Sequence, residues 1–130
     1  MERKELAEIV VRQCNKTLLK REQPELPDLS PKDWDRMLTF ASMQGVLPVI
    51  TQMFTKVKVE DEQLRALMMD WYCTAMDSQQ TYYKILEVMR QLSNLLAAEG
   101  LDIMFFKGAT LAQLYPCPEW REFNDIDFFL

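Results

Sequence analysis

The sequence contains no histidine, and this absence removes whole classes of chemistry. Serine and cysteine nucleophiles that depend on an imidazole base are excluded. A zinc site is not expected either, because the three cysteines, Cys14, Cys73 and Cys117, are widely spaced and form no C-x-x-C pair. Acid–base and metal chemistry must therefore rest on carboxylates.

Positive charge is also scarce. The chain has 15 Lys and Arg against 20 Asp and Glu, which gives a net charge of -5, so we expect no general nucleic-acid binding. Residues 1–21 carry charges throughout and form neither a signal peptide nor a membrane span. The odd number of cysteines is typical of reduced thiols. We therefore expect a cytoplasmic protein that makes no membrane contact.

Only three glycines interrupt the chain, and together with the prolines they mark where its predicted elements end. The apolar stripe within residues 1–21 predicts a helix, which a proline-rich connector follows. Ser30 is a predicted N-cap, with Pro31 as the first residue of a second helix that Gly45 closes. Pro48 then lies in the first turn of a third, short helix.

Neither glycine nor proline occurs between about Glu60 and Glu99, where apolar residues recur with helical spacing. We predict a single helix of roughly 40 residues here, about 60 Å long. A bend would cost least in the polar stretch at 77–80. Because so long a helix in a small chain packs against several others, we predict a helical bundle over residues 1–99.

After Gly100 the pattern changes from helical to strand-like. The stretch "LDIMFFKG" is typical of a buried strand of about five residues. A short helix "ATLAQLY", a proline-bounded loop "PCPEWREFN" and a second strand "DIDFFL" follow it. The predicted fold class is therefore α+β, with a mostly helical region at 1–99 and a strand-helix-strand region at 100–130.

Two aspartates, Asp125 and Asp127, lie one residue apart in the last predicted strand. Such residues point to one face of a strand, with Cα atoms roughly 7 Å apart, and repel unless a positive charge lies between them. An isolated D-x-D is usually a solvated pair. Here Ile126, Phe128 and Leu130 would form an apolar row on the opposite face, which predicts a covered strand. Carboxylates beside a covered strand are costly unless paired or bound to metal.

Lys107 and Gly108 lie at the predicted turn between strand and helix, and two interpretations stay open. The glycine could simply supply a positive φ angle. Alternatively, the backbone N–H groups of the turn and the lysine charge could hold an anionic phosphate. The spacing of a P-loop is absent. Arg121, taken alone, is best interpreted as a salt-bridge partner of the aspartates.

The stretch "FFKGATLAQLYPCPEWREFNDIDFFL" resembles a bacterial family of uncharacterised nucleotidyltransferases, part of the DNA polymerase β-like nucleotidyltransferase superfamily. The resemblance covers residues 101–130. It implies that Asp125 and Asp127 bind Mg²⁺ or Mn²⁺ and act in catalysis with a nucleoside triphosphate. It also implies that a phosphate-binding turn is formed by Lys107, Gly108, Ala109 and Thr110. Arg121 would be an auxiliary contact to a phosphate or a carboxylate.

Three departures from the family pattern affect these expectations. The usual Gly-Ser turn is Gly108-Ala109, so only Thr110 could supply the phosphate-binding hydroxyl. Asn124 replaces the common glycine, an exchange that asparagine tolerates at unusual backbone angles. The superfamily's third carboxylate lies on a later strand, and this sequence ends at Leu130.

We therefore expect the opening strand-helix-strand of a nucleotidyltransferase core, in a chain that looks like an N-terminal fragment. The expected function is metal-dependent transfer of a nucleotide from a nucleoside triphosphate to an unknown acceptor, with little turnover by these residues alone. The alternative is a non-catalytic helical interaction module with a relic D-x-D strand. Because the last strand would expose an unpaired edge, we also expect self-association, as a homo-oligomer.

Overall fold

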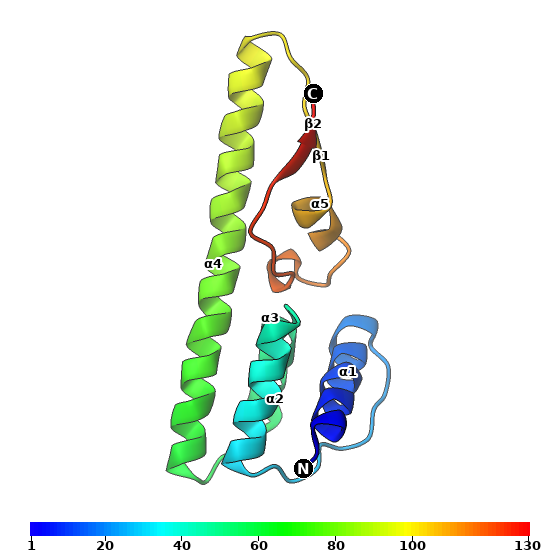
Figure 1. Cartoon of the computed structure of the whole chain (residues 1–130), viewed down its shortest axis with the longest axis vertical. Helices are drawn as coiled ribbons and strands as arrows, with labels where there is room; N and C mark the ends of the chain where they lie inside the picture. The colour runs from blue at the N-terminus through cyan, green and yellow to red at the C-terminus, as the bar shows by residue number, and fades with distance from the viewer. The chain divides into compact units, whose positions relative to one another are not determined.

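Helices make up most of the chain, and a small antiparallel sheet follows them (Figure 1). The computed structural model describes residues 1–130. Its elements are α1 (Arg3–Leu19), α2 (Pro31–Met43), α3 (Leu47–Ile50), η1 (Thr51–Lys56), α4 (Glu62–Ala98), β1 (Met104–Phe106), α5 (Gly108–Ala112), η2 (Pro118–Trp120) and β2 (Asp127–Phe129). The predicted α+β class and the order of elements are confirmed.

The chain divides into two compact units, Met1–Met76 and Asp77–Leu130. The division falls inside α4 because the second half of this helix packs with the residues that follow it. Tyr82 of α4, for example, contacts the ring of Phe123 and accepts a hydrogen bond from Gln113. The change in type of secondary structure still occurs near residue 100. The division into domains 1–99 and 100–130 stays a prediction.

Unit 1 is held together by a helical core. Its local structure follows the sequence closely, since Pro31 begins α2 and the Ser30 hydroxyl accepts a hydrogen bond from the Asp33 backbone N–H at 3.2 Å. The same hydroxyl donates to the Asp33 carboxylate and so lowers the pKa of that group. The core of this unit consists of apolar side chains of α1 to α4: Leu6, Ile9, Val10, Trp34, Met37, Leu38, Ala41, Leu47, Ile50, Met53, Leu64, Met68 and Ala75.

The long helix α4 runs for 37 residues, within two residues of the predicted bounds at either end. It continues through the polar stretch at 77–80 without interruption. Gly100 ends it with φ +73°, and the Leu101 backbone N–H donates to the Leu96 carbonyl oxygen at 2.9 Å. None of the helices, α4 included, has both the length and the apolarity needed to cross a membrane.

The sheet of unit 2 is smaller and more exposed than the sequence predicts. Strands β1 and β2 pair antiparallel, with Phe105 opposite Phe128 and Phe106 opposite Asp127. Each strand has three residues, so the expected strand of about five residues at β1 is too long. The prediction of a covered second strand is wrong, because Phe128 and Phe129 are 41% and 61% exposed. A sheet of two strands leaves each strand with an unpaired edge.

Candidate functional site

The turn between β1 and α5 is made by Lys107, and not by the glycine beside it. Lys107 has φ 54° and ψ -138°, a region that residues with a side chain rarely adopt. Only Gly45 and Gly100 among the glycines have positive φ, so the interpretation of Gly108 as the residue that supplies it is wrong. A conformation of this kind costs on the order of 1–3 kcal/mol and is typical of functional sites.

Gly108 is needed at the start of α5 for a different reason, the close approach of an aromatic ring. A Cβ atom at Gly108 would lie 3.1 Å from Cδ2 of Phe123. The ring of Phe123 has little room to move, because it also packs edge-on against Tyr82, with centroids 5.8 Å apart. The segment before β2 is therefore fixed against the first residue of α5.

Arg121 joins the same two segments by a hydrogen bond. Its Nη1 donates to the carbonyl oxygen of Gly108 at 3.2 Å, and its guanidinium lies 5.7 Å from the centroid of the Phe123 ring. Arg121 thus bonds to the backbone of the predicted phosphate turn, and it forms no ion pair with Asp125 or Asp127. Its position supports the turn and keeps a positive charge near it.

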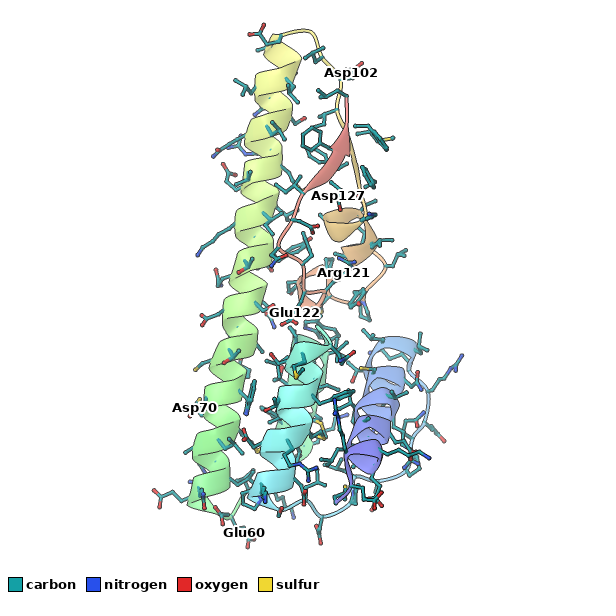
Figure 2. The ribbon with its side chains drawn as sticks, viewed as in Figure 1. Glu60, Asp70, Asp102, Arg121, Glu122 and Asp127 are labelled. Atoms are coloured by element: carbon teal, nitrogen blue, oxygen red, sulfur yellow. The ribbon has the colours of Figure 1, made fainter.

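The two aspartates are held differently. Asp127 is the first residue of β2, is half-buried, and lies opposite Phe106, directly before Lys107. Figure 2 shows Asp127 at the strand end beside α5. Asp125 lies before the strand and is exposed. The prediction that both aspartates lie in one strand is therefore wrong, because only Asp127 belongs to β2. No three carboxylate or thiol side chains come together anywhere in residues 1–130 as a metal-binding group.

The remaining residues of the predicted phosphate turn are Ala109 and Thr110. Ala109 is 8% exposed, so its methyl group packs inward and only its backbone N–H could bind a ligand. The Thr110 hydroxyl is exposed and donates to the Phe105 carbonyl oxygen at 3.4 Å, a long hydrogen bond. Lys107 is exposed as well, with Nζ 5.6 Å from the centroid of the Phe106 ring.

Glu122 is a feature of this site that sequence analysis missed. Its carboxylate is half-buried, and burial raises its pKa, while a hydrogen bond with the Ser78 hydroxyl acts in the opposite direction. Both residues line a pocket of about 350 Å³ together with Thr81, Phe123 and Asn124. The sequence does hold one signal, a carboxylate between Arg121 and Phe123 in the segment that leads to the D-x-D. Its burial against a residue of α4, distant in sequence, could not be read from that signal.

A larger pocket of about 480 Å³ lies in unit 1 and contains none of the predicted site residues. It is lined by α1, the connector after it, and the segment around η1, with Gln13 and Trp34 among its walls. Although this pocket is larger, we do not assign the predicted nucleotide chemistry to it, because the D-x-D and the lysine turn lie elsewhere.

Comparison with known proteins identifies one family, and its match spans parts of both units. A model of a family described as uncharacterised nucleotidyltransferase matches residues 30–130, from the N-cap of α2 to the end of the chain. No curated protein and no solved structure gives a significant match. The matched span includes every residue of the predicted site and most of the helical unit, and the family description gives a class of reaction without a donor or an acceptor.

Proposed function

Because the chain belongs to the family of uncharacterised nucleotidyltransferases, we propose that its site binds a nucleoside triphosphate with Mg²⁺ or Mn²⁺ and passes the nucleotide to an acceptor, with release of pyrophosphate. The observation that carries this proposal is the pairing of β1 with β2. It sets Asp127 opposite the residue that precedes Lys107, so an acidic and a basic side chain come from neighbouring strand ends. A metal–triphosphate complex needs both kinds of group.

The donor set suits a hard divalent cation. Mg²⁺ prefers oxygen ligands and usually takes one or two carboxylates from the protein, with the substrate phosphates and water completing its shell. Asp125 and Asp127 would supply those carboxylates. The chemistry that Mg²⁺ provides when bound is neutralisation of phosphate charge. Two carboxylates are enough to bind a metal with its nucleotide, while catalysis in the related superfamily uses a third.

The chain's own residues would bind and orient the triphosphate. The Lys107 ammonium is exposed and free to turn from the Phe106 ring toward a phosphate oxygen. The backbone N–H groups of Gly108 and Ala109 begin α5 and have no partner in the preceding turn of a helix. Because α5 has only five residues, its dipole adds little, and we assign most of the attraction to Lys107 and Arg121.

Two observations favour the alternative function, a non-catalytic interaction module. No three carboxylates gather into a metal-binding group in residues 1–130, and the aromatic side chains of β2 are exposed. A module of this kind would bind neither Mn²⁺ nor ATP at unit 2. Binding of ATP that depends on a divalent cation therefore separates the two functions before any acceptor is known.

The proposal is tested by paramagnetic broadening of the NMR spectrum of the whole chain by Mn²⁺. We expect resonances of residues 124–128 to broaden first, and more strongly when ATP is present. Asp127→Asn should abolish the local effect. Asp102→Asn, which removes an exposed carboxylate near the start of β1, is the matched control and should leave it unchanged. Equal broadening around Asp102 and Asp127, or an unchanged pattern in Asp127→Asn, would show that this is no metal site.

A further inference from the structure

The pocket beside the D-x-D segment has polar walls. It holds about 350 Å³ and is lined by Ser78 and Thr81 of α4 and by Glu122, Phe123 and Asn124 of the segment before β2. Four of these five side chains can form hydrogen bonds, and the Phe123 ring is the single apolar wall. Its last lining residue, Asn124, directly precedes Asp125 in the chain. A molecule in this pocket would therefore lie next to the expected nucleotide site.

The carboxylate of Glu122 has no cationic partner within the protein. Its sequence neighbour Arg121 donates to the Gly108 carbonyl oxygen instead, and none of the ion pairs in the structure includes Glu122. The Ser78 hydroxyl is a neutral partner and cannot balance the charge. A half-buried carboxylate without a cation is costly. A cationic ligand that reaches Glu122 would therefore be bound by a charge that no group of the protein neutralises.

We propose that this pocket is the acceptor subsite and that it binds an acceptor with a protonated amine next to hydroxyl groups. The Glu122 carboxylate accepts hydrogen bonds from the ammonium group. The Thr81 hydroxyl already donates to the Asp77 carbonyl oxygen at 3.2 Å, so it offers its lone pairs to a ligand hydroxyl. The Asn124 side chain is exposed and has both a donor and an acceptor to offer.

The assignment as an acceptor subsite rests on the proposed nucleotidyl transfer, whereas the preference for a cation rests on the pocket alone. The charge of the pocket also excludes the triphosphate from it. A phosphate chain would meet the Glu122 carboxylate and is repelled, while Lys107 and Arg121 lie on the side of α5 and attract it. Donor and acceptor would thus be sorted by charge into neighbouring positions.

The test compares two probes that differ in one group, glucamine and sorbitol. Glucamine is sorbitol with an ammonium in place of one hydroxyl, so the pair isolates the cation. The whole chain, labelled with ¹⁵N, is titrated with each probe in the absence of metal and nucleotide. We expect glucamine to shift the amide signals of residues 78, 81 and 122–124, and sorbitol to shift them far less. Glu122→Gln should weaken glucamine binding by about tenfold or more.

Glu119→Gln is the matched control, because Glu119 lies in the same connecting segment and is outside the pocket lining. It should leave glucamine binding unchanged. Equal shifts by glucamine and sorbitol, or equal loss in both variants, would overturn the cation preference, as would the absence of glucamine shifts at these residues. Since no metal or nucleotide is present, these outcomes are distinct from a failure of the Mn²⁺ experiment, which would leave a cation-binding pocket without a transferase.

Discussion

At the scale of single residues, Lys107 combines a strained backbone with an exposed charge. Glycine would adopt φ 54° and ψ -138° without a steric penalty. A lysine has a Cβ atom, so its backbone is strained at these angles. The strain is tolerated because β1 on one side and α5 on the other fix the turn. This combination is what we expect where a charge must be presented at one defined point.

Two substitutions at Lys107 separate backbone strain from charge. Lys107→Ala removes the charge and keeps the strain, and Lys107→Gly removes both. We expect Lys107→Gly to be more stable to urea than Lys107→Ala by about 1 kcal/mol, because the gain from relieved strain exceeds the added freedom of the unfolded chain. Both variants should bind ATP with Mg²⁺ more weakly than the wild type. Equal stability of the two variants would show that the turn is not strained.

The half-buried carboxyl of Glu122 should make the stability of the protein depend on pH. Burial raises the pKa of its carboxyl above the ordinary value of 4.5, so the folded protein binds more protons than the unfolded chain just above that pH. This contribution to stability is therefore fully present below pH 4.5 and is lost as the pH rises through the folded-state pKa. Glu122→Gln keeps a neutral side chain throughout. We expect its advantage in the free energy of unfolding over the wild type to grow between about pH 4 and pH 7, as measured by urea unfolding.

At the scale of elements, the helices were predictable and the site was predictable only in part. The bounds of α2 and α4 follow from local signals, Ser30 with Pro31 at one start and Gly100 at one end. The strands were predicted too long, because periodicity cannot tell that pairing stops after three residues. Asp125 therefore lies outside the strand that was expected to hold it. The burial of Glu122 depends on α4, and such long-range contacts leave little trace in the sequence.

The two ends of α4 should differ in stability. Leu64, Met68, Ala75 and Tyr82 are buried, whereas Leu95, near the C-terminal end of the helix, is 65% exposed. Because helical stability in proteins comes mostly from tertiary packing, we expect amides at 64–82 to exchange with solvent deuterium far more slowly than those at 88–98. Native-state hydrogen exchange measures this directly. Uniform protection along the whole helix would contradict the prediction.

At the scale of the whole molecule, the open sheet predicts self-association. Leu130 follows β2 and is 72% exposed, next to the unpaired edge of that strand. We expect the chain to associate through this edge, and Leu130→Lys to weaken the association because a lysine at an edge opposes further pairing. Sedimentation equilibrium over a wide range of concentrations measures it. Leu114→Lys is the control, since Leu114 is 81% exposed in the turn after α5, away from either strand. Equal weakening by both variants would rule out the edge.

The pairing of Phe106 with Asp127 also says where the chain can tolerate a change in length. The residues between these two partners form one connection, and the free energy of closing a connection rises only slowly as residues are added. Insertions near Leu114 should therefore be absorbed by the turn. A slip of one residue in the pairing of β1 with β2 would instead turn the Asp127 carboxylate to the opposite face of the sheet. The chain should therefore tolerate added residues near Leu114 but not a change of register in the strand.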